Sequence, residues 1–496
     1  MPKTVRRFAR IPVECIFVRM SYRNALLAAA ASLTGAIFFY YGTGLHPVWW
    51  LMWLAPMPVL LAASSLSRAS SFVVAFLAWG LGGLNLWPYL RGIIGIPIGI
   101  VILVVVGPAL IFGLAVLLHR SLLRQGRCWL AAFALPSLWV SYEYLNAVAS
   151  PHSTFGNLAY SQMNFLPVIQ IASLTGIWGI SFVIFLFAGT LAALLNRRVS
   201  AKQRRSLALG VGLILGATFL YCALRLSSRR SSDPTVAVLL IAKDVPDSAY
   251  PGKDAEALAL FHEYVDELRR ITPPGTQVIV LPEKIARVSE DALPQVDEMF
   301  SHAAADLHSG IVLGLVRSTA SGSFNESRYY SPEGTLQASY DKHHLIPGLE
   351  PELPGSARTL VPQPGGAWGL EICKDMDFPA LSREYGRDGA TLLLVPAWDF
   401  RVDGWLHGRM AVLRSVENGV GIARSARNGI LTINDNRGRI LAEADSSSFT
   451  FASAIGTLPS IRESTLYRRL GDWFAWLNLA AFFGILLLSL RPSKQR

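Results

Sequence analysis

The chain has 496 residues, of which 52% are hydrophobic and 16% are charged, whereas an average soluble protein has about 25% charged residues. The formal net charge of +11 is unevenly spread, because residues 1–230 hold 19 Lys or Arg and two acidic residues, whereas residues 231–465 hold 21 basic and 31 acidic residues. These values exclude a single soluble globule and a disordered chain. Because the positive charge flanks apolar segments, it also argues against a nucleic-acid partner.

Apolar stretches long enough to cross a membrane dominate the first 230 residues. About 20 residues, at a helical rise of about 1.5 Å each, cross the roughly 30 Å hydrocarbon core of a bilayer. We predict seven spans before residue 230 and an eighth near the C-terminus, at residues 25–41, 48–63, 72–90, 95–118, 129–147, 165–195, 206–226 and 473–490. Because further apolar stretches follow the first at once, we interpret that stretch as a span and not as a cleaved signal peptide.

The Lys and Arg residues in the connections between spans predict the orientation. Alternate connections and the two tails hold 18 Lys or Arg, whereas the opposite short connections hold Arg91 alone. By the positive-inside rule both termini are cytoplasmic, and an odd number of spans then delivers the following domain to the outer side. We therefore predict a cytoplasmic tail, a membrane domain of seven helices, an extracytoplasmic domain, a juxtamembrane segment with the eighth helix, and a second cytoplasmic tail, at residues 1–24, 25–230, 231–465, 466–490 and 491–496.

The predicted outer domain alternates short apolar runs with helical patterns. We predict strands at 235–241, 277–281, 310–316, 368–372 and 391–395. We predict helices at 254–271, 379–387 and 404–418. This alternation of strands and helices favours an α/β layered fold.

Three side chains with reactive chemistry come at or near the ends of apolar segments. Glu283 follows QVIVL in LPEK, Lys342 lies in YDKHHLIP, and Cys373 ends the run GLEI in EICKDMDFP. Strand ends are where open α/β sheets collect active residues. Each residue also has a structural interpretation: a solvated turn carboxylate, a surface charge, and a packed thiol with no disulfide partner in its domain. Together they supply a base, a cation and a soft nucleophile, the minimum needed for acyl transfer through a thioester.

The order and spacing of these residues resemble the nitrilase superfamily, which uses a Glu–Lys–Cys triad. Within it, the segments YDKHHLIPGLE, CKDMDFP and RSARNGI, together with Trp398 after LLLVP, are similar to the apolipoprotein N-acyltransferases. A domain inserted between the seventh and eighth of eight spans also resembles that family. The resemblance implies a polytopic α-helical membrane protein with an inserted α/β nitrilase-like domain, an αββα sandwich.

The resemblance also implies roles for individual residues. Cys373 corresponds to the nucleophile, Glu283 to the general base, and Lys342 to the cation that stabilises the oxyanion. Glu350, eight residues after the lysine, corresponds to a second carboxylate that supports the site. Asp375 and Trp398 are further supporting candidates.

Several positions depart from the family pattern. Leu281 precedes Pro282 and Glu283 where the family usually has Trp, and Lys374-Asp375 follows the cysteine where the family usually has Tyr-Glu. Asp375 keeps the carboxylate but shortens its reach, whereas Lys374 either lowers the pKa of the thiol or reshapes the acyl pocket. Lys284 adds a further cation beside the base. A divergent paralogue with another substrate is therefore an alternative.

The function implied by the resemblance is N-acyl transfer in a bacterial inner membrane. A phospholipid would donate a fatty acyl chain through a cysteine thioester to the α-amino group of the diacylglyceryl-cysteine of an apolipoprotein, and a monomer among membrane lipids is expected. A membrane-bound nitrilase-type amidase is one alternative. A non-catalytic assembly or transport protein is another, disfavoured because the spans hold hardly any ionisable groups. No metal or other cofactor is predicted, because metal-binding spacings and a Gly-rich phosphate loop are missing from the sequence.

Overall fold

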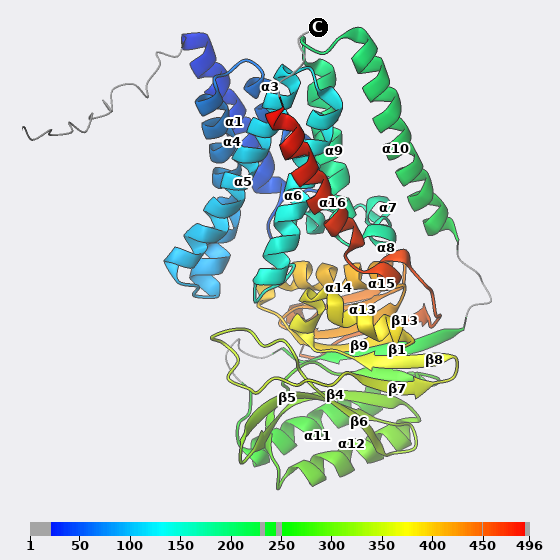
Figure 1. Ribbon diagram of the computed structural model, residues 1–496. Helices are drawn as coiled ribbons and strands as arrows, with labels where there is room; N and C mark the ends of the chain where they lie inside the picture. The colour runs from blue at the N-terminus through cyan, green and yellow to red at the C-terminus, as the bar shows by residue number, and fades with distance from the viewer. Residues whose placement is uncertain (1–20, 229–233, 245–249, 449, 492–496) are drawn as a thin grey trace, which may run out of the picture.

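A computed structural model describes residues 21–228, 234–244, 250–448 and 450–491. A layer of long helices stands on a β-rich domain, and two further helices cover the far side of that domain (Figure 1). Most of the two predicted tails lies outside the described residues, and so does Cys15.

The membrane part consists of helices that run back and forth along one axis (Figure 1). Its elements are α1 (Tyr22–Gly42), α2 (Leu51–Leu54), α3 (Met57–Ala63), α4 (Arg68–Gly82), η2 (Gly83–Leu86), η3 (Pro88–Ile93), α5 (Ile98–Arg124), α6 (Cys128–Ala149), η4 (Leu158–Gln162), α7 (Leu166–Ile169), α8 (Ala172–Thr175), α9 (Trp178–Leu195), α10 (Ala201–Ser227) and, after the β-rich domain, α15 (Leu466–Leu470) and α16 (Trp473–Leu490). Among the described residues, six helical segments are long and apolar enough to cross a membrane: α1, α4 continued to Ile93, α5, α9, α10 and α16. The 22-residue helix α6 falls outside these six because polar residues such as Glu143 dilute its apolar composition, yet it packs against α5, α9 and α16.

The predicted span at residues 48–63 is not one continuous helix. The helical part of this stretch, Leu51–Ala63, is divided between α2 and α3, with Pro56 between them. It is shorter than the roughly 20 residues of a regular spanning helix. The stretch still returns the chain along α1, since a Cβ at Gly42 would meet Met52 and one at Gly35 would meet Val59.

The predicted span at residues 165–195 is also shorter than expected. The short helices α7 and α8 come first, and Gly176, with a φ of +67°, separates them from α9. Only Trp178–Leu195 of this stretch is long enough to cross a membrane. Glycine adopts such left-handed backbone without the steric cost of a Cβ, which explains the break at this position.

The β-rich domain is a sandwich of two sheets between two pairs of helices. One sheet has the order β13-β1-β2-β4-β5-β6, with β3 beside β4, and the other has the order β12-β11-β10-β9-β8-β7. Its strands are β1 (Thr235–Ala242), β2 (Val278–Val280), β3 (Arg287–Ser289), β4 (Gly310–Thr319), β5 (Gly322–Tyr330), β6 (Leu336–Asp341), β7 (Thr359–Gln363), β8 (Gly366–Leu370), β9 (Ala390–Trp398), β10 (Gly421–Arg427), β11 (Ile430–Asn434), β12 (Ile440–Asp445) and β13 (Ala452–Pro459). Its helices are α11 (Asp254–Ile271), α12 (Leu293–Leu307), α13 (Pro379–Arg387) and α14 (Gly404–Asn418), with short turns η5 (Cys373–Asp377), η6 (Arg401–Asp403) and η7 (Ser446–Ser448).

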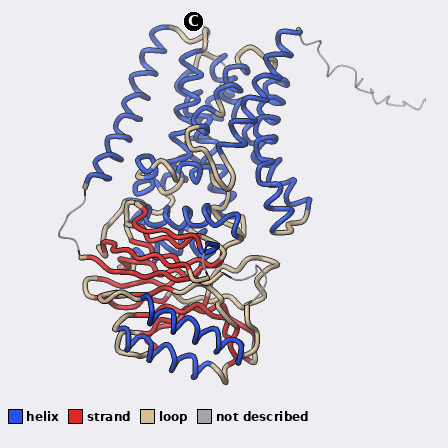
Figure 2. Tube along the Cα trace, turned by 180° about the vertical axis from the view of Figure 1, so that it is seen from behind, coloured by secondary structure: helices blue, strands red, loops and turns tan. Residues whose placement is uncertain are grey.

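The continuous apolar runs of the central strands follow from burial on both faces. In β9, Leu392 and Leu394 pack between the two sheets, while Leu393 and Val395 pack against Tyr385 of α13. Alternating residues of one strand therefore reach two different cores, so neither face is polar. The helices α11 and α12 cover the other sheet, on the side away from the membrane part (Figure 2).

Parallel strands form the centre of each sheet. Strand β2 lies between β1 and β4, and strand β9 lies between β8 and β10, all in parallel. Their carboxyl ends consequently lie at one edge of the sandwich. The backbone N–H of Glu283 donates to the carbonyl of Ala397 at 3.2 Å, which joins the end of β2 to the end of β9 across the two sheets.

Candidate active site

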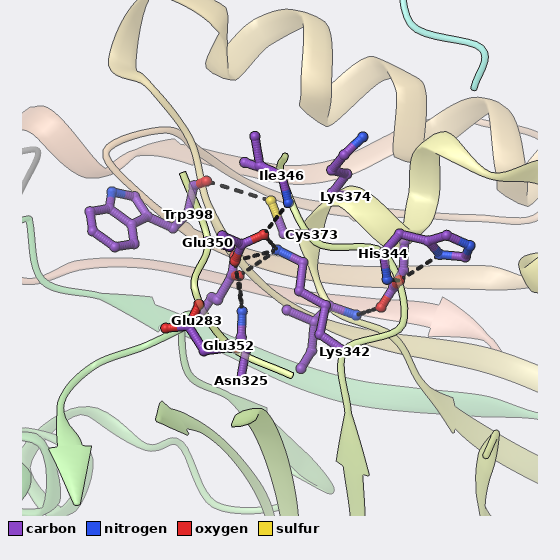
Figure 3. A network of polar contacts seen from close by, with 12 residues as sticks. Glu283, Asn325, Lys342, His344, Ile346, Glu350, Glu352, Cys373, Lys374 and Trp398 are labelled. Atoms are coloured by element: carbon purple, nitrogen blue, oxygen red, sulfur yellow. Dashed lines mark hydrogen bonds and ion pairs between the residues drawn. The ribbon is translucent and has the colours of Figure 1, made fainter. Parts of the chain in front are cut away.

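The structure brings Glu283, Lys342 and Cys373 together at this edge of the sandwich (Figure 3). Glu283 follows β2, Lys342 follows β6, and Cys373 begins the turn η5 shortly after β8. The ammonium Nζ of Lys342 donates to Oε1 of Glu283 at 2.8 Å. The charges of both residues act on the Cys373 thiol.

Cys373 has a strained backbone and an almost fully buried side chain. Its φ is +44°, in the left-handed region that costs a non-glycine residue about 1–3 kcal/mol. Its thiol donates a weak hydrogen bond to the carbonyl of Trp398, at 3.5 Å. Burial raises the pKa of Cys373 well above its usual value, Glu283 raises it further, and Lys342 opposes both. The resting side chain is therefore a neutral thiol, which becomes a strong nucleophile only if a base removes its proton.

Glu283 presents one free carboxylate oxygen. Its Oε1 accepts from Lys342 and from Nδ2 of Asn325, the latter at 2.5 Å. Its Oε2 is buried and has no hydrogen-bond partner among the described residues. Because a buried oxygen without a partner gains most from a new hydrogen bond, Oε2 is the atom best placed to accept a proton.

Lys342 remains charged although its side chain is only 1% exposed. Burial by itself would lower the pKa of Lys342, but Glu283 and Glu350 raise it well above the usual value. Nζ lies 3.0 Å from both carboxylate oxygens of Glu350. A fixed, desolvated ammonium of this kind can stabilise an oxyanion without having to reorganise solvent.

Glu350 connects the triad to a second buried ion pair. Oε1 lies 2.8 Å from Nζ of Lys284, which in turn donates to Oε2 of Glu352 at 2.9 Å. The backbone N–H of Ile346 donates to Oε2 of Glu350 at 2.7 Å. Burial would raise the pKa of Glu350, but Lys342 and Lys284 lower it to about 2, so the carboxylate is ionised.

The sequence identified neither Asn325 nor Glu352 as a site residue. Asn325 lies in the interior of β5, where it is 1% exposed, and Glu352 is 4% exposed. An isolated polar residue in a strand, or an acid two positions after another, carries no local signal of burial. Only the tertiary arrangement reveals these contacts.

Asp375 fixes the conformation of the nucleophile turn. Its Oδ2 accepts from the hydroxyl of Tyr340 at 2.7 Å and from the N–H of Ile372 at 3.2 Å. Its Oδ1 accepts from the backbone N–H of His344 at 2.9 Å. With this many donors, the carboxylate is occupied in holding the loop of Lys342 against the turn of Cys373.

Trp398 contributes its backbone and its ring in different ways. Its carbonyl faces the Cys373 thiol, while its indole ring lies under the guanidinium of Arg427, at 3.6 Å from the ring centroid. Lys374, by contrast, points away from the carboxylates of the site (Figure 3). Among the described residues, no group of three or more His, Cys, Asp or Glu is placed to hold a metal ion.

Comparison with known proteins identifies both parts of the chain. Residues 21–190 match the family model of the apolipoprotein N-acyltransferase N-terminal domain, and residues 236–460 match that of carbon-nitrogen hydrolases. An apolipoprotein N-acyltransferase of Geobacter metallireducens is 27% identical, with 95% of this chain and 96% of the relative covered. One of Allorhizobium ampelinum is 28% identical, with 88% and 92% covered.

Solved structures also match part of the chain. An amidase from Nesterenkonia sp. is 21% identical with a TM-score of 0.39, over 47% of this chain and 93% of its own. One assignment agrees with all of these matches. The two family models match in chain order, and the relatives match along nearly the whole chain. The chain belongs to the apolipoprotein N-acyltransferases, a family of membrane acyltransferases in the nitrilase superfamily.

Proposed function

We propose that this protein moves a fatty acyl chain from a phospholipid, through a thioester on Cys373, to the α-amino group of the diacylglyceryl-cysteine of an apolipoprotein. The observation that carries the proposal is the buried Glu283–Lys342 pair beside the neutral thiol, with Oε2 of Glu283 unoccupied among the described residues. The names of the relatives supply the acceptor class. The apolar helices are long enough to hold the protein in a membrane, where both lipid substrates reside.

The first half-reaction forms the thioester. Glu283 takes the proton of Cys373 as the sulfur attacks the ester carbonyl of the phospholipid, and the Lys342 ammonium stabilises the negative charge that develops on the carbonyl oxygen. The tetrahedral intermediate then expels the lysophospholipid alkoxide, which takes the proton back from Glu283. The products are an acyl-cysteine and a lysophospholipid.

The second half-reaction transfers the acyl group to nitrogen. The acceptor amine attacks the thioester carbonyl, and Glu283 takes a proton from the nitrogen as the C–N bond forms. Collapse of the intermediate breaks the C–S bond, and the thiolate recovers its proton from Glu283. Because both substrates react in turn at the same sulfur, the scheme predicts ping-pong kinetics.

The arrangement in the membrane is part of the proposal. Residues 25–230 form the membrane domain and residues 231–465 the catalytic domain on the outer face of a bacterial inner membrane. Residues 466–490 return the chain to the cytoplasm, the tails at 1–24 and 491–496 are cytoplasmic, and the protein acts as a monomer. The Lys and Arg asymmetry of the connections supports this orientation.

Trapping the acyl-enzyme tests the mechanism. Incubation with a phospholipid carrying a labelled acyl chain is expected to leave a label on Cys373 that hydroxylamine releases. Cys373→Ala is expected to carry no label, whereas changing Cys15, Cys128 and Cys222 to Ala is expected to leave labelling unchanged. Addition of a diacylglyceryl peptide is expected to convert the label into an amide. Release as free fatty acid at the same rate, with or without the peptide, would instead identify a hydrolase.

A further inference from the structure

The turn that carries Cys373 is hydrogen-bonded to the membrane part of the chain. Residues 150–157 form a loop between α6 and η4, which we call the anchor loop. Thr154 donates to the carbonyl of Asp377 twice, from Oγ1 at 2.7 Å and from its backbone N–H at 3.3 Å. Nζ of Lys374 donates to the carbonyl of Pro151 at 2.9 Å. Three hydrogen bonds therefore cross between the two parts of the protein within four residues of the thiol.

These contacts are buried and leave their groups little freedom. Thr154 is 2% exposed, and Lys374 and Asp377 are each 3% exposed. The hydroxyl of Thr154 also pairs with that of Tyr160 at 2.7 Å, and Tyr160 accepts from Arg414 of α14 at 3.4 Å. Hydrogen bonds in such a water-poor environment are stronger than at a surface, and their loss leaves buried groups without partners.

The ammonium of Lys374 makes its hydrogen-bond contacts with the anchor loop. Its Nζ lies 3.3 Å from Nδ1 of His152 and 3.9 Å from Oδ2 of Asp377, besides its bond to Pro151. Figure 3 shows the side chain pointing away from Glu283 and Lys342. The residue next to the nucleophile is therefore attached to the membrane part, which explains why a long cation occupies this position.

The conformation of Cys373 requires support of this kind. A non-glycine residue at a φ of +44° persists only where the surroundings fix the chain on both sides. Strand β8 fixes the chain before the cysteine, and Asp375 fixes the turn from within the catalytic domain. The anchor loop adds hydrogen bonds at Lys374 and Asp377, which lie one and four residues after the cysteine.

We propose that the anchor loop positions the nucleophile, so that Thr154 and Lys374 hold the turn of Cys373 in its reactive geometry only while the catalytic domain is seated on the membrane helices. Thr154 and Lys374 are positioning residues, since they act through the turn and do not touch the reacting atoms. The inference rests on the proposed role of Cys373. It adds that the membrane part is required for the chemical step as well as for delivering lipid.

The test uses the full-length protein in lipid nanodiscs, in a background where Cys15, Cys128 and Cys222 are Ala. Thr154→Val removes the hydroxyl while conserving shape, and Thr154→Ser keeps it as the matched control. Two rates are measured for each variant: acyl-cysteine formation from phospholipid, and alkylation of Cys373 by iodoacetamide from pH 6 to 10. The charged groups that act on the thiol, namely Glu283, Lys342, Lys374, Asp399 and Arg424, stay unchanged in the Thr154 variants.

A loosened turn is expected to slow acyl-cysteine formation and to make alkylation of Cys373 faster at a given pH. Thr154→Val is expected to slow acylation roughly tenfold, because small displacements of a reacting group cost up to about 10²-fold in rate. The alkylation midpoint is expected to fall by about one pH unit, since a better-solvated thiol loses part of the pKa increase that burial causes. Thr154→Ser is expected to stay within about twofold of the parent in acylation, because its hydroxyl keeps the bond to Asp377.

A second pair of variants keeps the test decisive if Thr154→Val does not fold. Lys374→Met removes the bond to Pro151 and is expected to slow acylation as Thr154→Val does, whereas Lys374→Gln retains an N–H donor and is expected to slow it less. Because the charge of Lys374 also acts on the thiol, the alkylation midpoint is compared only among the Thr154 variants. Folded Thr154→Val protein with the acylation rate and alkylation profile of the parent, or folded Lys374→Met protein with the acylation rate of the parent, would overturn the inference. Acyl transfer that persists in Cys373→Ala would instead overturn the proposed function.

Discussion

At the scale of single residues, the site is a chain of alternating buried charges. Glu283, Lys342, Glu350, Lys284 and Glu352 follow one another at 2.8–3.0 Å, with side chains at most 6% exposed. Each charge is tolerated because its neighbours have the opposite sign. Removing one member consequently leaves a buried charge without compensation, which typically costs about 3–5 kcal/mol.

Replacing the proposed base and the proposed oxyanion cation is expected to slow one step. Glu283→Gln conserves shape but removes proton transfer, and general-base loss costs about 10²–10⁴-fold. Lys342→Met removes one donor to the oxyanion, and such a loss lowers the rate by about 10²–10³-fold. Both are expected to slow single-turnover acylation without weakening phospholipid binding, since transition-state interactions leave ground-state binding unchanged. Near-normal single-turnover acylation in either purified variant would falsify its assigned role.

Lys284 and Glu352 are expected to make non-additive contributions to the free energy of unfolding. Lys284→Met leaves the buried Glu352 with only the more distant guanidinium of Arg287, at 3.9 Å, and is expected to lower the free energy of unfolding by about 3 kcal/mol. The double variant Lys284→Met/Glu352→Gln is expected to lose less than the sum of the single changes, because the neutral amide needs no cation. Denaturant unfolding of the four proteins measures the coupling, and additive losses would contradict it.

At the scale of elements, helix α14 joins the catalytic domain to the membrane part through a half-buried histidine. His407 lies 3.2 Å from Asp403, which also accepts from the hydroxyl of Tyr89 in η3 at 2.6 Å. The His407 ring stacks on Phe155 of the anchor loop. Burial would lower the pKa of His407, but Asp403 raises it to about 9.

This raised pKa predicts how stability changes with pH. A pKa of about 9 in the folded protein, against about 6.5 when unfolded, stabilises the fold by on the order of 3 kcal/mol. The contribution is complete below pH 6.5 and is lost as the pH rises through 9. The thermal midpoint is therefore expected to fall between pH 6.5 and 9.5 in the parent, and to fall less in His407→Gln. Equal falls in the two proteins would show that another group is responsible.

At the scale of the whole molecule, the helices and the catalytic domain form two stacked parts joined by α10 and α16 (Figure 1). The first turn of α10 and the last turns of α5 and α16 lie at the end remote from the catalytic domain. That end carries basic residues such as Arg120, Arg124, Lys202 and Arg205. This distribution is typical of a cytoplasmic face.

The proposed orientation predicts the outcome of reporter fusions. A reporter that is active only outside the cytoplasm is expected to be active when fused at Ser321, in the exposed turn between β4 and β5. The same reporter fused after Arg496 is expected to be silent. The opposite pattern would contradict an extracytoplasmic catalytic domain.

Much of the domain was predictable because its elements carry strong local patterns. The helices predicted at 254–271, 379–387 and 404–418 have the bounds of α11, α13 and α14. The strands expected at 235–241 and 391–395 are apolar after an initial Thr, and they form β1 and β9, which are both interior strands of their sheets. Strand β5, GSFNESRYY, was missed because the partners of its buried Asn325 and Arg328 include Glu283 and Asp297, which lie far away in the sequence.

The candidate site was predictable only in part, because the partners of several of its buried polar residues are distant in the sequence. The three triad residues stand in recognisable segments after strands, whereas the partners of Lys284 and Lys374 come from remote parts of the chain. The sequence left Lys374 with two interpretations, a lowered thiol pKa or a reshaped acyl pocket. The structure shows a third, a bond to Pro151 that lies 223 positions away.

The pairing of β1 with β13 bears on how such a protein can arise. These two strands are the first and last of the catalytic domain, they run antiparallel with Thr235 opposite Pro459, and the N–H of Ser460 donates to the carbonyl of Pro234 at 2.9 Å. The domain thus begins and ends at one point. A free-standing enzyme with adjacent termini can enter the connection between two membrane helices without moving either helix apart. The adjacent ends therefore make the architecture compatible with the placement of a whole domain in one connection between helices.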